Sequence, residues 1–350
     1  MKTNSNIVYL YTEIMPYQTI VYKELSNRGY SVYAFYNDKG RQTPYEAEKI
    51  DNVYYYPNSK YSPDNLYKFI CEINPIILVV CGWSSSKYLY VARRFKKKKQ
   101  VPVVCPIDTQ YIGRLKQKIG FLISPFYIKR HFTHIWVPGV RQYYFACRLG
   151  YSPSNIILNS LTGNINLFKE SNIDIKIKEY PKRILFVGRY KEVKGLTLLM
   201  DVWDSIEDKK GWSIVCAGNG PLKEFIEKHN AVEVMDFQSQ DKLVQLAESC
   251  GAFILPSNYE PWALVLQEFA AAGLPIICSE ACGASPHFVI NNYNGYSFKT
   301  NDFNDLRDKI NKIIKADNNK LIDMSYNSRQ LSGMVTPEIS AASLLSILDK

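Results

Sequence analysis

Short apolar runs alternate with helical segments along the first half of the chain. Runs rich in β-branched and aromatic residues predict strands at Ile7–Tyr11, Ser31–Tyr36, Ile76–Cys81, Val101–Pro106, Ile135–Pro138 and Asn155–Leu158. Apolar residues spaced three and four apart predict helices at Tyr17–Arg28, Ser86–Phe95 and Arg141–Leu149. This alternation is typical of a doubly wound α/β domain with a parallel sheet.

The same alternation begins again after a charged segment, Lys169–Lys182, which we interpret as a linker. The second series predicts strands at Arg183–Val187, Trp212–Ala217, Ala252–Leu255 and Pro275–Ser279, and helices at Leu196–Ile206, Leu222–Lys228, Lys242–Cys250 and Leu264–Ala272. We therefore expect an N-terminal domain at 1–168, a linker at 169–182 and a C-terminal domain at 183–335. The two domains are expected to face a cleft, because parallel sheets bind ligands at the carboxyl ends of their strands.

A helix signal closes the chain. Thr336 is a good N-cap, and Pro337 suits the first helical position, so a helix is predicted from there to about Leu348. This segment, 336–350, is a candidate to pack back on the N-terminal domain.

The composition is that of a folded protein. Of the 350 residues, 46% are hydrophobic and 22% are charged, which excludes disordered and fibrous classes. The apolar runs are shorter than the roughly 18 residues of a membrane-spanning helix, and Met1–Asn6 leads directly into a strand, so we expect a cytoplasmic protein without a signal peptide. The eight scattered cysteines form no C-x-x-C motif, which favours free thiols over a disulfide or zinc framework.

Positive charge is concentrated in one window. The chain carries a net charge of +10, and residues 87–130 hold twelve bases, Lys96 to Lys99 among them, against one acid, Asp108. Such a patch attracts nucleic acid, anionic lipid or another polyanion.

Within that window, Ile112, Leu115, Ile119, Leu122 and Phe126 recur at helical spacing, with Pro125 expected to end the helix just before the last of them. This helix either packs on its own domain or docks residues 112–130 on an anionic inner-leaflet surface.

Two glycine-containing loops follow predicted strands of the second half. The first, Gly188–Gly195, carries Arg189 and Lys194 and leads into a helix, an arrangement that suits a diphosphate but is also seen in solvated loops. In the second, Gly218 and Gly220 allow close approach of either a ligand or another loop.

The segment PSNYEPWALVLQEFAAAG, residues 256–273, contains two glutamates with different surroundings. Glu260 lies in the loop before a helix, and Glu268 lies within that helix among apolar residues. A dry, unpaired carboxylate is costly, so Glu268 either meets a polar group, such as a ribose diol, or lies on the surface.

Glu260 and Glu268 form an E-x7-E pair, which Ala-Ala-Gly-Leu-Pro-Ile-Ile and then Asn294-Gly295 follow. Together with the two glycine loops, this order of motifs resembles the retaining glycosyltransferases of family 4, densely over 184–298 and more loosely before it. The resemblance implies the GT-B fold, two Rossmann-like parallel-sheet domains.

The resemblance also implies roles for individual residues. Arg189 and Lys194 would hold the donor diphosphate, Glu260 the donor sugar and Glu268 the ribose hydroxyls. The remaining donor-binding positions would be in the two glycine loops and at a helix N-terminus: Gly188, Gly218, Gly220, Ala263, Leu264 and Val265. The donor would be a UDP- or GDP-linked sugar, with no further cofactor and no metal.

Some positions depart from the family pattern. Thr12–Gln18 replaces a loop that usually contains Gly-Gly, Ala263 and Asp236 stand where glycine is usual, and the acid expected after Ser285 is absent. Asp108 follows a predicted strand, where it either reaches the reacting sugar or caps a turn.

The predicted function is transfer of a sugar to a saccharide or lipid-linked acceptor, in synthesis of a surface polysaccharide, lipopolysaccharide or glycolipid, in the cytoplasm or at the inner face of the membrane. The alternatives are a GT-B epimerase or phosphorylase, a nucleic-acid-binding protein that uses the 87–130 patch, and an inactive binding subunit. Glu268 has no role in nucleic-acid binding, which makes that partner the less favoured one.

Overall fold

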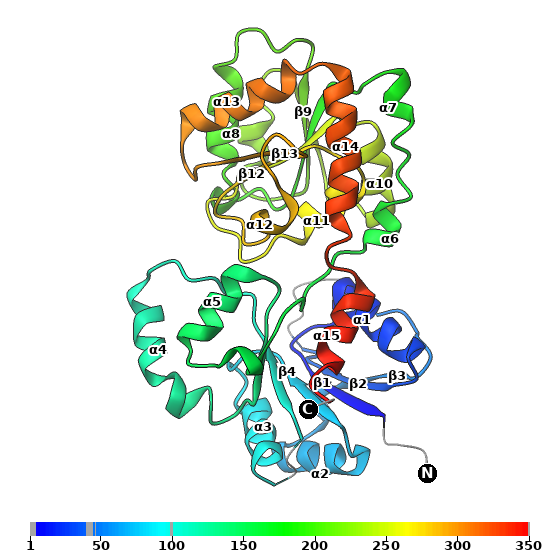
Figure 1. Cartoon of the computed structure of the whole chain (residues 1–350), viewed down its shortest axis with the longest axis vertical. Helices are drawn as coiled ribbons and strands as arrows, with labels where there is room; N and C mark the ends of the chain where they lie inside the picture. The colour runs from blue at the N-terminus through cyan, green and yellow to red at the C-terminus, as the bar shows by residue number, and fades with distance from the viewer. Residues whose placement is uncertain (1–4, 40–44, 46, 99–100, 349–350) are drawn as a thin grey trace. The chain divides into compact units, whose positions relative to one another are not determined.

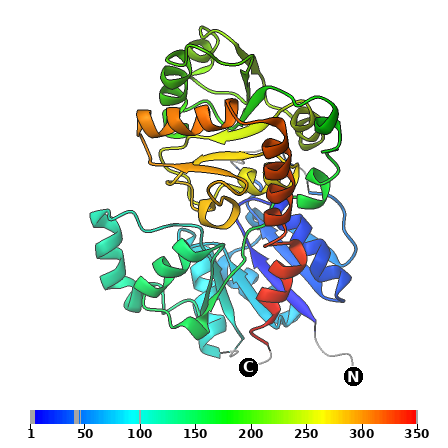
Figure 2. The same cartoon turned by 45° about the horizontal axis from the view of Figure 1, so that its top comes forward.

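Two all-parallel β-sheets organise the chain (Figures 1 and 2). The computed structural model describes residues 5–39, 45, 47–98 and 101–348. Unit 1 combines the chain up to Thr162 with the stretch from Val335 onward, and unit 2 is Gly163–Met334. The predicted fold class, two doubly wound parallel-sheet domains, is confirmed.

Unit 1 contains a seven-stranded sheet of order β3-β2-β1-β4-β5-β6-β7. Its strands are β1 (Asn6–Leu10), β2 (Ser31–Tyr36), β3 (Val53–Pro57), β4 (Ile77–Val80), β5 (Val103–Pro106), β6 (His134–Trp136) and β7 (Ile156–Ile157). Its helices are α1 (Pro16–Asn27), α2 (Pro63–Ile73), α3 (Ser86–Lys98), α4 (Leu115–Tyr127), α5 (Val140–Arg148) and α15 (Pro337–Leu345). From β1 the sheet extends to one side through β2 and β3 and to the other side through β4 to β7, so the strand order reverses between β1 and β4.

Alternate residues of each strand in unit 1 enter two different cores. Ile7 and Tyr9 of β1 pack with α1 and α15, whereas Val8 and Leu10 pack with α2, α3 and α5. Because successive strand side chains point to opposite faces, both faces of the sheet are covered and the strands are buried.

Unit 2 contains a six-stranded sheet of order β10-β9-β8-β11-β12-β13. Its strands are β8 (Arg183–Val187), β9 (Ser213–Ala217), β10 (Val232–Met235), β11 (Ala252–Leu255), β12 (Ile276–Ser279) and β13 (Gly295–Phe298). Its helices are α6 (Ile165–Phe168), α7 (Ile175–Lys178), α8 (Leu196–Asp204), α9 (Lys223–Ile226), α10 (Gln240–Glu248), α11 (Leu264–Ala271), α12 (Ser285–Phe288), α13 (Phe303–Ile314) and α14 (Asn318–Ser332). A stack of Phe253 on Phe269, with ring centroids 4.4 Å apart, joins β11 to α11.

The segment interpreted as a linker, Lys169–Lys182, packs into unit 2. It contains α7, its Lys176 is fully buried, and the Lys176 ammonium donates a 3.2 Å hydrogen bond to the carbonyl of Gly273. Burial lowers the pKa of Lys176 to about 7. The density of charge suggested an exposed connection, but the structure buries one of those charges together with the apolar Ile173 and Tyr180.

The prediction that Pro125 ends its helix is wrong, because α4 continues to Tyr127 with Pro125 inside its last turn. A proline this close to a helix end removes little of the helix's hydrogen bonding. At the other end of the chain, α15 packs on α1 within unit 1, and Ala341, Leu344 and Ile347 enter that core.

Across the described ranges, the structure contains no helix with both the length and the hydropathy of a membrane span.

Candidate active site

Sheet growth in unit 2 reverses direction between β8 and β11, which are neighbours in the sheet. In open parallel sheets, ligands bind beyond the carboxyl ends of the strands at such a reversal. The loop after β8 carries Arg189 and Lys194, and the loop after β11 carries Glu260 and leads to α11. The structure therefore brings these predicted residues to one edge of one sheet.

Close backbone contacts hold the loops together. A side chain at Gly195 would place its Cβ 2.0 Å from the carbonyl oxygen of Pro256, and one at Gly218 would place it 1.9 Å from that of Gly188. A side chain at Gly220 would place its Cβ 2.5 Å from the carbonyl oxygen of Tyr190. Gly218 and Gly220 were expected to allow close approach of either a ligand or another loop, and in the structure another loop, Gly188–Tyr190, lies against both.

Lys194 and Glu260 form an ion pair at this edge, and each side chain is less than one-fifth exposed. Arg189 is exposed on the same loop as Lys194. The backbone of Glu260 is in turn hydrogen-bonded to the 281–283 loop, since its carbonyl accepts a 2.9 Å bond from the N–H of Gly283. A fixed cation and a fixed carboxylate thus lie side by side where β8 and β11 end.

Helix α11 begins at this edge with an unusual backbone conformation. Its N-cap, Ala263, has a φ of 85°, a left-handed conformation that favours glycine. The first N–H groups of a helix, here those of Leu264 and Val265, have no acceptor within the helix, and Ala263 has no side-chain oxygen that could accept from them. Such a helix start attracts anions.

Buried polar side-chain atoms of the preceding loop also lack a hydrogen-bond partner. The hydroxyl of Ser257 and the indole N–H of Trp262 have no partner among the described residues, although both side chains are buried. Buried polar groups are normally satisfied, so this loop has unused hydrogen-bonding capacity.

Glu268 lies one turn beyond the start of α11 and is half-buried. Burial raises the pKa of its carboxyl to about 7, while hydrogen bonds from the Asn164 backbone and the Gln240 side chain partly offset that effect. The Gln240 amide donates to Glu268 at 3.2 Å. Of the two alternatives for this carboxylate, a polar partner or a place on the surface, the structure shows the polar partner.

Sequence reasoning missed the residues that hold Glu268 in place. Gln240 begins α10, and the Asn164 amide donates to its side-chain oxygen at 3.3 Å. Gly163 lies directly over Glu268, because a Cβ at Gly163 would approach the Glu268 Cγ to 2.7 Å. No local pattern in the sequence marks Gln240.

Asp108 belongs to unit 1, where it is exposed beyond the carboxyl end of β5. Burial, and then the negative charge of Asp108, raise the pKa of Cys81 to about 11. The pKa of Tyr17 is raised by burial and by the charges of Cys81, Asp108 and Glu13. Asp108 therefore lies in a group of titratable side chains at the carboxyl edge of this sheet, and its role stays a prediction.

The bases of the 87–130 window do not form one uniform patch. Lys87 donates to the carbonyls of Asn58 and Tyr61, Arg94 pairs with Asp64, and Lys96 donates to backbone carbonyls. The exposed bases are at the end of α3 and around α4: Lys97, Lys98, Arg114, Lys116, Lys118 and Arg130. Lys99 lies outside the described residues.

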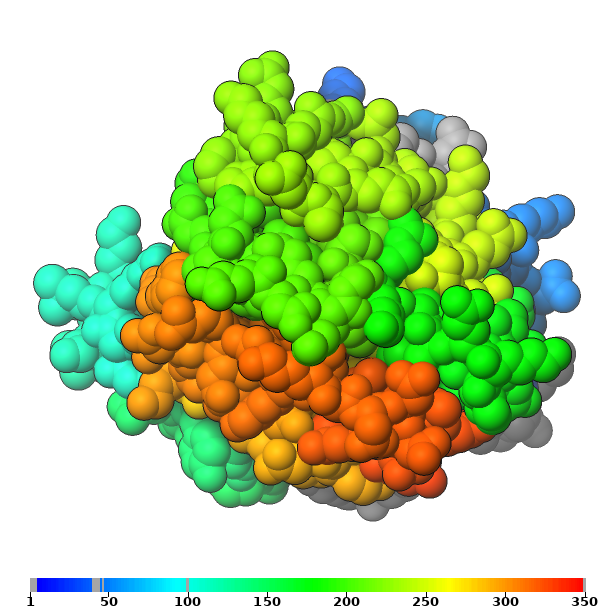
Figure 3. Space-filling view, turned by 90° about the horizontal axis from the view of Figure 1, so that it is seen from above, coloured from blue at the N-terminus to red at the C-terminus, as the bar shows by residue number. Residues whose placement is uncertain are grey.

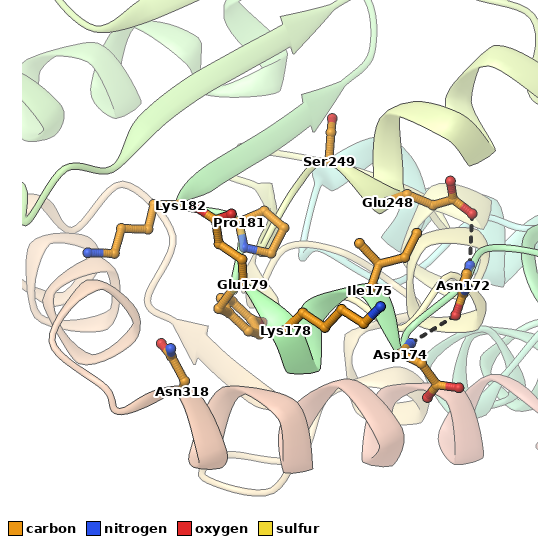
Figure 4. A pocket seen from close by; sticks show the side chains of 11 residues that line it. Asn172, Asp174, Ile175, Lys178, Glu179, Pro181, Lys182, Glu248, Ser249 and Asn318 are labelled. Carbon is orange, nitrogen blue, oxygen red and sulfur yellow. Dashed lines mark hydrogen bonds between the residues drawn. The ribbon is translucent and has the colours of Figure 1, made fainter.

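A cavity of about 1020 Å³ in unit 2 lies at the opposite, amino-terminal edge of the sheet, where β8 and β11 begin (Figure 4). Charged residues of both signs line it, including Lys178, Lys182 and Glu248. Figure 4 shows Lys182 and Glu248 extending away from each other, while Glu248 accepts a hydrogen bond from the backbone of Asn172. This cavity is therefore separate from the predicted donor site.

Comparison with known proteins identifies the region that contains the predicted donor residues. Residues 168–331 match one family model, glycosyl transferases group 1. This group 1 region lies wholly within unit 2 and includes the loops after β8 and β11.

An uncharacterized glycosyltransferase of Methanocaldococcus jannaschii is 30% identical over 138 residues, which are 36% of this chain and 35% of that protein. The chain spans about a third of the length of the curated relatives that it matches first. A Campylobacter jejuni N,N'-diacetylbacillosaminyl-diphospho-undecaprenol alpha-1,3-N-acetylgalactosaminyltransferase is 25% identical over 52% of this chain and 47% of its own length.

The structure of Anabaena HepE in complex with UDP aligns with a TM-score of 0.74 at 15% identity, covering 97% of this chain and 99% of that one. At this identity the likeness shows the fold alone. It confirms the GT-B fold predicted from the sequence.

Residues 5–39, 45, 47–98 and 101–348 contain no group of three or more His, Cys, Asp or Glu side chains arranged to hold a metal ion. Independence from metal stays a prediction.

Proposed function

We propose that this protein is a retaining glycosyltransferase that moves a sugar from a UDP- or GDP-linked donor to a saccharide or lipid-linked acceptor. The Lys194–Glu260 ion pair beside the start of α11 carries this proposal. It combines a cation, a carboxylate and a set of backbone N–H groups at the strand reversal of unit 2. The group 1 match over 168–331 supports it, since that region contains the whole arrangement.

In this proposal the reaction needs stabilisation of the departing nucleoside diphosphate more than it needs a nucleophile from the protein. Arg189 and Lys194 neutralise the diphosphate, and the α11 backbone from Ala263 to Val265 adds N–H donors. Preorganised donors of this kind typically contribute on the order of 10²–10³ in rate each. We infer front-side attack with retention, and no carboxylate nucleophile.

The carboxylates act on hydroxyl groups of the donor. Glu260 accepts hydrogen bonds from the transferred sugar, and Glu268, held by Gln240, accepts them from the ribose. We further propose that Asp108 contacts the reacting sugar.

We further propose a pathway of surface polysaccharide, lipopolysaccharide or glycolipid synthesis, with the protein in the cytoplasm or at the inner face of the membrane. The Campylobacter relative supports a lipid-linked acceptor, because its name describes a saccharide on diphospho-undecaprenol.

The test is a thermal-shift screen of the full chain with UDP, GDP, ADP, CMP and NAD, on wild type, Glu268→Ala and Glu227→Ala. Glu227 is an exposed glutamate of the same unit and serves as the matched control. At a ligand concentration of 100 times Kd, one nucleoside diphosphate should stabilise wild type and Glu227→Ala by about 2.7 kcal/mol. Glu268→Ala should lose most of that gain.

A lack of response to every nucleotide would overturn the donor-site assignment. Strong salt-dependent binding to duplex DNA in the same preparation would then favour the nucleic-acid alternative. An active protein whose product has the inverted anomeric configuration by NMR would leave the donor site standing and refute retention. Interconversion of two nucleotide sugars without any acceptor would favour an epimerase.

A further inference from the structure

Helix α4 of unit 1 presents its apolar side chains to solvent. Leu122 is 76% exposed and Phe126 is 80% exposed. Together with their neighbours on the same side of the helix they form what we call the apolar ridge: Leu115, Ile119, Leu122, Ile123 and Phe126. Side chains of this part of the chain, in cyan, stand out at the left margin of Figure 3. A contiguous exposed apolar surface of this kind marks an interaction site.

The opposite face of α4 is anchored to unit 1. The Ser124 hydroxyl donates to the carbonyl of Leu149 at 2.8 Å, and the Gln117 amide donates to that of Gln110 at 2.8 Å. The Phe121 ring packs edge-on against Phe145 of α5, with centroids 5.3 Å apart, and Figures 1 and 2 both show the two helices side by side. The helix is therefore fixed with its apolar ridge outward.

Positive charge flanks the ridge on both sides. At 3.6 residues per turn, Lys116 and Lys118 lie on opposite sides of the line through Leu115, Ile119, Leu122 and Phe126. Both lysines are exposed, and Arg130 is exposed just beyond the helix end. An apolar strip between cations has the character of a helix that lies in a membrane interface, with its bases at the headgroups.

We propose that α4 is a membrane anchor that inserts its apolar ridge into the surface of an anionic bilayer while Lys116, Lys118 and Arg130 contact the headgroups. Most protein contacts to a nucleic acid are polar contacts to phosphate and sugar, which a strip of five apolar side chains does not supply, so the ridge favours a bilayer over a polyanion alone. A two-fold contact between two copies of α4 would bring like charges together, which argues against a second copy. The proposal is independent of sugar transfer, because it uses none of the donor-site residues.

The experiment is sedimentation of the full chain with vesicles of phosphatidylcholine alone and of phosphatidylcholine mixed with phosphatidylglycerol, at low and high salt. We expect binding to the mixed vesicles that weakens with salt. Leu122→Ser/Phe126→Ser should weaken it at least tenfold. Lys116→Gln/Lys118→Gln should weaken it roughly thirtyfold on mixed vesicles, with little change on phosphatidylcholine alone. Phe237→Ser, which removes an aromatic residue of unit 2 that is 78% exposed, should bind like wild type.

Equal binding to both vesicle types, or wild-type binding by Leu122→Ser/Phe126→Ser, would overturn the proposal. A wild-type dimer that the same double substitution converts to a monomer, without vesicle binding, would assign the ridge to a second copy. Binding of a duplex oligonucleotide but of no vesicle would assign the charges to nucleic acid. The thermal shift with nucleotide reports separately on the donor site, so failure of one proposal is distinguishable from failure of the other.

Discussion

Burial of the Glu268 carboxylate should lower the stability of the folded protein at neutral pH, although the same carboxylate is the group proposed to bind the donor ribose. Its pKa is raised from the ordinary 4.5 to about 7, chiefly because burial disfavours the charged form. Between these values the unfolded chain has released a proton that the folded chain still holds, so stability falls as the pH rises through this window and levels off above it. Because one pH unit corresponds to about 1.4 kcal/mol, the upper limit of the loss is about 3 kcal/mol.

Glu268→Gln removes the charge while it keeps an oxygen that accepts from Gln240. Near pH 4 the carboxyl is protonated in the folded chain and largely protonated in the unfolded chain as well, so we expect almost equal free energies of unfolding. Near pH 8 the variant should be more stable by up to about 3 kcal/mol, and by less where the half-buried carboxyl reaches water. Urea titrations over this pH range measure the difference, and the exposed control Glu227→Gln should stay within about 0.5 kcal/mol of wild type throughout.

The same variant should bind nucleoside diphosphate more weakly than wild type, although it is more stable. A stability difference that stays constant from pH 5 to pH 8, or a wild type that is the more stable protein at pH 8, would refute the burial argument. A variant that gains stability and also keeps full nucleotide affinity would instead refute the role given to Glu268 in binding.

Three further substitutions test other parts of the structure. Gly195→Ala should destabilise the protein by more than about 2 kcal/mol, because its Cβ would lie 2.0 Å from the Pro256 carbonyl oxygen. Gly120→Ala, in open space within α4, should stabilise it by about 0.5–1 kcal/mol, so the melting temperatures of the two variants should move in opposite directions. Lys176→Met should raise the free energy of unfolding by about 1–4 kcal/mol at pH 6. The reason is that burial lowers the pKa of Lys176 from 10.5 to about 7, so the unfolded wild-type chain binds this proton more tightly than the folded chain does. A variant that urea unfolds more easily than wild type would contradict this. Leu344→Ala, fully buried in α15, should cost about 2–4 kcal/mol, and an unchanged urea midpoint would contradict the packing of α15 into unit 1.

Buried strands could be predicted from the sequence and most edge strands could not. Ser31–Tyr36, Arg183–Val187 and Ala252–Leu255 have the predicted bounds, because strands covered on both faces are continuous apolar runs. The strands missed are β3, β10 and β13, and each is the last strand at an edge of its sheet. In β3 and β10 most residues are at least partly exposed, so no apolar run marks them.

Several missed helices did have a signal in the sequence. The side chains of Ser62, Asp302 and Asp317 cap α2, α13 and α14, and each accepts a hydrogen bond from the N–H three residues on. These are the residue types that identified the helix at Thr336. The N-cap residues therefore mark the start of all three helices.

Most of the predicted site residues could be found because they lie in loops directly after predicted strands, and Glu268 because it is a carboxylate among the apolar residues of a helix. What no local pattern could supply is the set of contacts between loops. The approach of Gly195 to Pro256 and the hydrogen bond from Gln240 to Glu268 join segments far apart in the chain, and only the folded sheet brings them together.

The division of unit 1 into two segments has a consequence for biosynthesis. All of unit 2 is translated between Thr162 and Val335, so the ribosome completes the second unit before it makes the helix that finishes the first. Until α15 emerges, the face of α1 that Ala341 and Leu344 cover lacks those side chains and exposes apolar surface to the cell. The nascent chain therefore has its greatest need for a chaperone at unit 1, the half that was synthesised first.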